Sequence, residues 1–176
     1  QDVVIELNAQ HGSMVDPDAV AESKVEMFLK IIPQMEAIKP VADFARSLEG
    51  RFPMAVASGS EEIIVRGCLA ASGLLHLFPT IVTPAYVKRG KPAPDMFLEA
   101  AKRISVPPSE CVVFEDAVPG FDGAIAAGMG LVKVPSRSCV VRPPLMVARS
   151  GSKSLMISSC IRVSKFCSRS RVHLQF

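Results

Sequence analysis

The stretches Gly90-Lys91-Pro92-Ala93-Pro94-Asp95 and Val112-Val113-Phe114-Glu115-Asp116-Ala117-Val118-Pro119-Gly120 decide how this sequence is interpreted. In the first, prolines fix the backbone around Lys91, so its ammonium group can neutralise phosphate and carboxylate charge. In the second, two adjacent carboxylates end an apolar strand, where they repel each other unless a cation is present. Mg²⁺ prefers one or two carboxylates together with waters and phosphate oxygens. The two stretches therefore predict a site for a phosphate group and a magnesium ion, with Glu115 and Asp116 as metal ligands.

Short apolar strands alternate with helices through the middle of the chain. We expect strands at 54–57, 78–83, 111–114 and 131–134, with helices opening after Ser60, at Pro94-Asp95 and near Phe121. Continuous apolar strands separated by helices of ~10–15 residues are typical of parallel pairing. The pattern predicts an α/β fold, a Rossmann-like parallel sheet with helices on both faces. Ligands bind such sheets at the carboxyl ends of the strands, where Ser58, Lys91 and Glu115-Asp116 all fall.

Two further helices are expected before the first of these strands. Asp16-Pro17-Asp18 is a helix-start pattern, and apolar residues follow at the spacing of one helix face at Val25, Phe28, Leu29 and Ile32. The second helix is expected over 41–48, ending at Gly50.

Each predicted site residue also has a plainer interpretation. Ser58-Gly59-Ser60 follows a strand and precedes a helix, so its hydroxyl and N–H groups form either an anion site or an ordinary helix cap. Lys91 is either a positioned cation or a solvated surface lysine. Glu115-Asp116 is either a magnesium pair or an acidic pair facing a helix dipole. The three features fall at the same edge of the predicted sheet, which favours the functional interpretation.

Charge is unevenly distributed along the 176 residues. Residues 1–136 hold 12 Lys/Arg against 17 Asp/Glu, a net of −5, whereas residues 137–176 hold 8 Lys/Arg and no acid, a net of +8. We expect this Ser-rich basic tail to be disordered or to come from a non-native reading frame. The alternative is a basic arm for nucleic acid or an anionic membrane. We expect no nucleic-acid or membrane partner for the domain itself.

Targeting signals and metal-binding cysteine patterns are not evident. No window approaches the ~18 apolar residues of a membrane span, the N-terminus lacks the pattern of a signal peptide, and the five cysteines do not have zinc-ligand spacing. We therefore expect a cytoplasmic protein with reduced thiols. The oligomeric state is not indicated.

The motifs resemble those of the haloacid-dehalogenase-like hydrolases, in the subfamily with a helical cap. Ser58, Lys91 in GKPAPD and Glu115-Asp116 in VVFEDAVPG match three ordered motifs of that family, and the stretch from about Val4 to Pro135 looks closest to fructose-1-phosphate and 6-phosphogluconate phosphatases. The resemblance implies that Ser58 hydrogen-bonds the transferring phosphoryl group and Lys91 balances its charge. It implies that Glu115 and Asp116 hold Mg²⁺, directly or through water. Gly59 and Ser60 are expected to help bind the substrate because their loop offers N–H groups to an anion. Ala117 stands where many relatives have serine.

One family motif has no counterpart in this sequence. The family's nucleophile and general acid lie in a D-x-D motif at the end of a mid-sheet first strand, and Asp16-Pro17-Asp18 has those letters without a preceding strand. The chain is therefore expected to begin inside the cap, with the first strand absent. Buried backbone groups left unpaired cost about 1–3 kcal/mol each against a typical stability of ~5–15 kcal/mol. We expect a chain that is marginally stable or unfolded and that is inactive as it stands.

The resemblance also divides the chain and limits the possible functions. We expect a partial helical cap over 1–38, a core over 39–136 and the tail over 137–176. The first functional hypothesis is a Mg²⁺-dependent phosphatase of small sugar phosphates. The second is a phosphosugar mutase similar to β-phosphoglucomutase, which the missing general-acid segment and the cap would distinguish. The third is a non-catalytic relative that binds phosphate or a partner.

Overall fold

The structure is a computed structural model, and it describes residues 2–134, 154–157 and 161–163. The α-helices are α1 (Asp2–His11), α2 (Pro17–Ile31), α3 (Lys39–Ser47), α4 (Glu62–Ala71), α5 (Asp95–Arg103) and α6 (Val118–Ala126). The strands are β1 (Met35–Ala37), β2 (Met54–Ala57), β3 (Thr80–Val82), β4 (Cys111–Glu115), β5 (Gly130–Lys133), β6 (Ser154–Ile157) and β7 (Ile161–Val163). Short 3-10 helices lie at Ile32–Gln34, Leu75–Leu77, Pro84–Tyr86 and Pro108–Glu110.

A five-stranded sheet forms the centre of the molecule, in the order β3-β2-β6-β4-β5. All four neighbouring pairs are parallel, so the predicted α/β fold with a parallel sheet is confirmed. Three strands differ from their predicted bounds, and one of them is β5, which covers Gly130–Lys133 in place of 131–134. β3 is confined to Thr80–Val82 and β4 extends to Glu115, which places the first predicted metal ligand inside the sheet.

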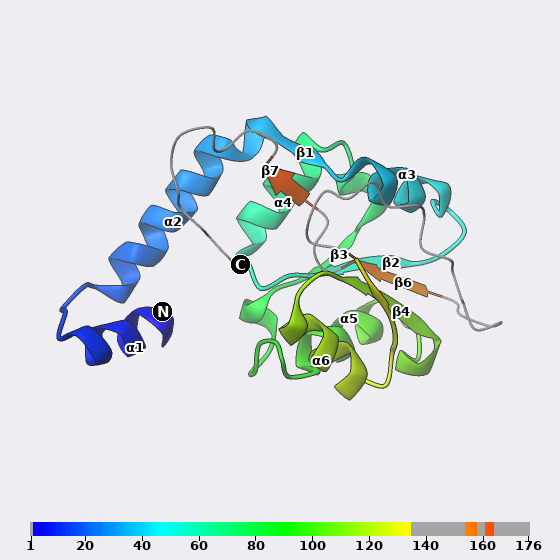
Figure 1. The fold of residues 1–176 in the computed structure, drawn as a ribbon. Helices are drawn as coiled ribbons and strands as arrows, with labels where there is room; N and C mark the ends of the chain where they lie inside the picture. Colours follow the sequence, from blue (N-terminus) through cyan, green and yellow to red (C-terminus); the bar gives the residue numbers. More distant parts are fainter. Residues whose placement is uncertain (1, 135–153, 158–160, 164–176) are drawn as a thin grey trace.

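Alternate residues of β2 pack on opposite faces of the sheet. Met54 and Val56 join a core cluster with residues of α3 and α4, whereas Ala55 and Ala57 join a second cluster with residues of α5 and α6. Figure 1 shows the corresponding arrangement, with α3 and α4 on one side of the sheet and α5 and α6 on the other. Because helices cover both faces of the sheet, all four residues of β2 are buried. For the same reason, polar and apolar residues do not alternate in its sequence.

The middle strand of the sheet is β6, from the basic tail. It pairs with β2 on one side, where Met156 lies opposite Ala55, and with β4 on the other, where Met156 lies opposite Val113. The tail over 137–176 is expected from the sequence to be disordered or to come from a non-native reading frame, and in the structure its residues Ser154–Ile157 form a strand of the sheet. The physical reason is that the facing edges of β2 and β4 need backbone partners, and Leu155-Met156-Ile157 is an apolar run that can lie there. The rest of that expectation lies outside the described residues, apart from β7, which pairs antiparallel with β1.

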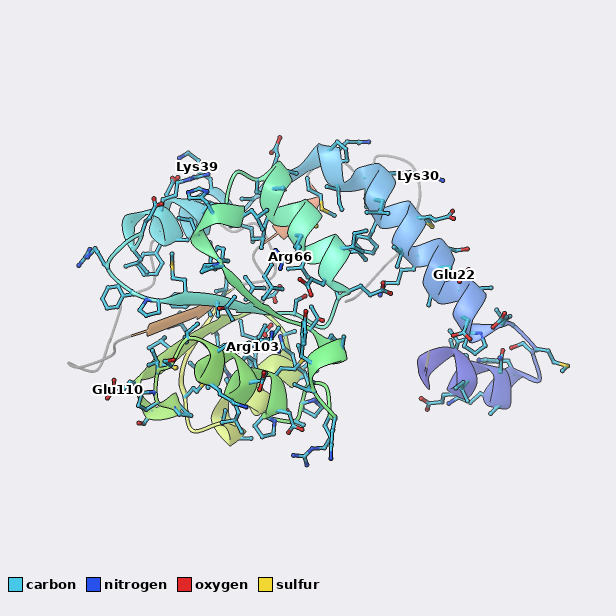
Figure 2. All side chains as sticks on the ribbon, turned by 180° about the vertical axis from the view of Figure 1, so that it is seen from behind. Glu22, Lys30, Lys39, Arg66, Arg103 and Glu110 are labelled. Atoms are coloured by element: carbon cyan, nitrogen blue, oxygen red, sulfur yellow. The ribbon has the colours of Figure 1, made fainter. Side chains whose placement is uncertain are left out.

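The N-terminal helices extend away from the sheet (Figures 1 and 2). α2 starts as predicted, because the Asp16 carboxylate accepts a hydrogen bond from the Asp18 N–H at 2.9 Å. None of its residues is buried. Figure 2 labels Glu22 and Lys30 along this helix. α1 was not predicted. Within the described part of the chain, every helix is too short or too polar to cross a bilayer.

Candidate active site

All six predicted site residues line one cavity of about 480 Å³. Ser58, Gly59 and Ser60 form the loop that follows β2, and Lys91 lies in the loop before α5. Glu115 is the last residue of β4 and Asp116 follows it. The chain runs from β2 to β3 on one side of the sheet and from β4 to β5 on the other. The cavity thus lies where the strand order reverses, the usual position of a ligand site in such sheets.

Lys91 and Glu115 form a buried ion pair. The Lys91 Nζ lies 2.8 Å from Glu115 Oε2, and the side chains are 14% and 1% exposed. The second carboxylate oxygen, Glu115 Oε1, accepts hydrogen bonds from the N–H groups of Asp116 at 3.0 Å and Ala117 at 3.1 Å. Lys91 is therefore not a solvated surface lysine. A buried carboxylate held by a cation and two N–H groups is a fixed part of the cavity wall.

Lys91 also packs against the apolar core, because its Nζ lies 5.2 Å from the centroid of the Phe97 ring. Phe97 is fully buried on α5. The aromatic face and the carboxylate together hold the ammonium group in place at the cavity. Neither contact could be read from the sequence, where only the prolines indicated a positioned lysine.

Asp116 is half-buried beside Glu115, and its pKa is raised to about 6 from an ordinary value of 3.8. Burial is the largest cause, followed by the hydrogen bond and the charge of Glu115, while Lys91 opposes the rise. The alternative of a helix-dipole pair does not describe Glu115, because α6 begins only at Val118 and Glu115 belongs to β4. A carboxyl group with a raised pKa in a cavity is a candidate functional group.

The Ser58–Ser60 loop does not cap the helix that follows it. α4 is capped by the backbone of Glu61 with no side-chain cap bond. The Ser58 N–H donates to the Val82 carbonyl at 2.9 Å, and the Ser58 hydroxyl accepts from the Ser60 N–H at 3.2 Å. A serine hydroxyl has one proton as well as its acceptor sites, so Ser58 can still donate to a phosphate oxygen in the cavity.

Gly120 allows the close approach of α6 to Glu115. A Cβ atom added at Gly120 would lie 2.0 Å from Glu115 Oε2. Only a hydrogen atom fits between the helix backbone and the carboxylate. The sequence signal for this contact is the glycine five residues after Glu115, to which no role was assigned from the sequence.

Helix α2 also contributes to the cavity, because Lys24 and Phe28 line it together with apolar residues of the core. Phe28 was predicted as part of an apolar helix face, whereas Lys24 was not singled out from the sequence. The sequence signal that could have identified Lys24 was its spacing from Phe28, because residues four apart lie on the same face of a helix. The Lys24 Nζ lies 6.0 Å from the centroid of the Phe28 ring.

Across the described residues, no group of three or more His, Cys, Asp or Glu side chains is arranged to hold a metal. A site of the zinc type is therefore absent from that part of the chain. The carboxylate pair Glu115-Asp116 instead fits the needs of Mg²⁺, which takes one or two carboxylates and completes its shell with water and phosphate oxygens.

A model of the haloacid dehalogenase-like hydrolase family matches residues 7–128. The chain belongs to this family. The predicted resemblance is thereby confirmed. The chain is 44% identical over 131 residues to fructose-1-phosphate phosphatase YqaB of Escherichia coli, with 74% of this chain and 68% of that protein covered. It is 33% identical over 132 residues to the putative phosphatase YhcW of Bacillus subtilis, where 74% of this chain and 60% of the relative are covered.

Solved structures support the same fold. A family hydrolase from Deinococcus radiodurans, with bound phosphate and sodium, is 31% identical and aligns with a TM-score of 0.58 over 89% of this chain and 69% of its own. CbbY from Rhodobacter sphaeroides, in complex with phosphate, aligns with a TM-score of 0.67 over 86% of this chain and 69% of its own at 22% identity. The second likeness concerns the fold alone. This chain thus spans about two thirds of the length of these proteins.

Proposed function

We propose that the cavity is the phosphate and Mg²⁺ site of a sugar-phosphate phosphatase, and that residues 1–176 bind both without turning substrate over. The observation that carries the proposal is that Ser58, Lys91, Glu115 and Asp116 all line one cavity. A volume of about 480 Å³ lies in the range of small-molecule sites. The likeness to a fructose-1-phosphate phosphatase supports a small phosphorylated metabolite as the substrate class.

Each residue has a defined part in binding. Glu115 and Asp116 would hold the metal ion, which when bound polarises a phosphoryl oxygen and neutralises developing charge. Lys91 is held in place by its contacts with Glu115 and Phe97. It would add a fixed positive charge at the phosphate. Ser58 donates a hydrogen bond from the β2 side, and the Gly59 and Ser60 segment lines the same side.

Turnover needs a nucleophile that the described cavity does not offer. In this family an aspartate attacks phosphorus and the aspartyl-phosphate is then hydrolysed. Glu115 and Asp116 are the only carboxylates among the described residues that line the cavity, and Glu115 is held in its ion pair. Asp16 caps α2 through the Asp18 N–H, and neither residue lines the cavity. We therefore expect binding without phosphate release.

A panel of sugar phosphates tests the proposal. The 176-residue chain is incubated with fructose 1-phosphate and related sugar phosphates, with and without Mg²⁺, and released phosphate and bound orthophosphate are both measured. The expected result is Mg²⁺-dependent orthophosphate binding without release, lost in Lys91→Ala and kept in the control Lys102→Ala, which changes an exposed lysine of α5. Steady release would refute the expected inactivity. Absence of orthophosphate binding would refute the site.

A further inference from the structure

Tail strand β6 joins two halves of the sheet that have no other strand pairing among the described residues. β2 pairs with β3 and β6, and β4 pairs with β5 and β6. Residues Leu155, Met156 and Ile157 lie opposite residues of both neighbouring strands. The β3-β2 half and the β4-β5 half are therefore connected across the sheet by a four-residue segment from the far end of the chain.

The candidate site is divided between the same two halves. Ser58 follows β2, whereas Glu115 ends β4 and Asp116 follows it. Lys91 is tied to the β4 half through its ion pair with Glu115. Adjacent strands lie about 4.8 Å apart, so strands separated by one strand lie about 10 Å apart. The separation of Ser58 from the charged cluster therefore depends on the strand that lies between β2 and β4.

We propose that Ser154–Ile157 is a positioning segment, a tail strand that sets the separation between Ser58 and the Lys91–Glu115–Asp116 cluster. The part of this proposal that concerns phosphate rests on the proposed function. Without β6, the facing edges of β2 and β4 either stay open to water or pair directly at about 4.8 Å. In both cases no strand between β2 and β4 fixes the separation of Ser58 from the charged cluster, so a single phosphate group is expected to contact both sides less well.

The two binding partners should respond differently to a change in this strand. Both predicted metal ligands lie on the β4 side, so Mg²⁺ affinity does not depend on the separation. Orthophosphate must reach Ser58 on one side and the charged cluster on the other, so its affinity does. A strand that served only to stabilise the fold would not produce this split in a protein that remains folded.

The proposal is tested with Met156→Pro and its matched control Met156→Val. Proline removes a backbone N–H from a central strand, where each N–H faces one neighbour or the other, whereas valine keeps the N–H and favours strands. Binding is measured by calorimetry at a temperature where circular dichroism shows both variants folded. We expect the control to match the parent chain. We expect Met156→Pro to keep its Mg²⁺ affinity and to lose at least about tenfold in orthophosphate affinity at saturating Mg²⁺, the effect of losing one hydrogen bond to a charged group.

Unchanged orthophosphate binding in Met156→Pro would overturn the proposal, as would equal losses for both ligands. If Met156→Pro does not fold, amide hydrogen exchange on the unaltered chain tests the proposal instead. We expect the amides of residues 155–157 to be protected to the same degree as those of β2 and β4. Exchange of these amides at the rate of an unstructured peptide would overturn the proposal. Protected amides in a chain that does not bind orthophosphate would refute the proposed function while leaving β6 in its place in the sheet.

Discussion

The sheet core and the N-terminal helices of this molecule are held by very different amounts of packing. Met96, Phe97 and Val113 are fully buried between the sheet and its helices, whereas α2 has no buried residue and Leu29 on its apolar face is 40% exposed. Local stability follows local burial. The difference teaches that the charged groups of the cavity are carried by the well-packed part of the molecule, whereas Lys24 and Phe28 belong to a helix without a buried residue.

This difference in packing suits the proposed site, which must bind a phosphate group tightly and must also let it enter. The charged groups are fixed by β4, the Lys91 loop and the β2 loop, where small displacements weaken binding strongly. Lys24 and Phe28 line the same cavity from α2, a helix without a buried residue that packs on a small core cluster through partly buried side chains. Closing elements of enzyme sites are commonly drawn from weakly packed regions of this kind.

Truncation of one apolar side chain in each region is expected to give the largest contrast. Phe97→Ala should reduce the free energy of unfolding by about 3–5 kcal/mol, because it leaves a cavity in the core. Leu29→Ala on α2 should change it by no more than about 0.5 kcal/mol. Urea unfolding of the two variants and the parent chain measures both. Similar losses in the two variants would contradict the proposed division of packing.

The ion pairs of the molecule sharpen the same comparison. Lys91→Met should reduce stability by about 3 kcal/mol, because it leaves the buried Glu115 carboxylate without its cation. Arg89→Met breaks a pair of comparable length, 2.7 Å between Arg89 Nη2 and Asp95 Oδ1, in which the arginine is exposed. Its effect should be much smaller, because water screens exposed pairs. The ranking is checked by thermal unfolding without Mg²⁺, and an equal shift in melting temperature would contradict it.

Gly120→Ala is expected to have an intermediate effect that is concentrated at the site. The new Cβ would lie 2.0 Å from Glu115 Oε2, and the carboxylate is held in place by Lys91 and two N–H groups. We expect a stability loss of about 1–3 kcal/mol together with weaker Mg²⁺ binding. Gly90→Ala is the control, because no heavy atom lies within 4 Å of a Cβ at that position. Unaltered Mg²⁺ affinity in Gly120→Ala would show that Glu115 does not need its present position.

A pH titration is expected to give the smallest effect. The pKa of Asp116 is raised from 3.8 to about 6, so between these values the native state binds more protons than the unfolded state. Stability without Mg²⁺ should therefore fall as pH rises from about 4 to about 6. Mg²⁺ affinity should rise over the same interval, because the ion binds the deprotonated carboxylate. Asp116→Asn should remove the Asp116 contribution to both trends. If both pH trends are as steep in Asp116→Asn as in the parent chain, they arise from the titration of another group.

The regular part of the fold could be predicted from the sequence for a physical reason. β2 and the interior of β4 are continuous apolar runs followed by polar residues, and that pattern is typical of strands buried on both faces of a parallel sheet. The helices after them were found through their apolar spacing and through Pro94-Asp95. The same edge-of-sheet argument brought Ser58, Lys91 and Glu115-Asp116 together, and the structure places all of them in one cavity.

The features that escaped prediction depend on distant contacts or on weak local signals. Ser154–Ile157 is a short apolar run in a tail with no acidic residue, and its role depends on the two strand edges that it joins. β1 pairs with β7 across more than a hundred residues of chain. Lys24 lies on an exposed helix, where a lysine is the ordinary choice. Its place at the cavity follows only from how α2 lies against α4.

Calorimetric titration of orthophosphate, with and without Mg²⁺, tests the central claim that groups from two halves of the sheet form one site. The parent chain is compared with Ser58→Ala on the β2 side and Asp116→Asn on the β4 side. We predict saturable binding that requires Mg²⁺ and is weakened about tenfold or more by either substitution, since each removes a contact to the charged ligands. Binding that is independent of Mg²⁺, or that survives both substitutions unchanged, would contradict the claim.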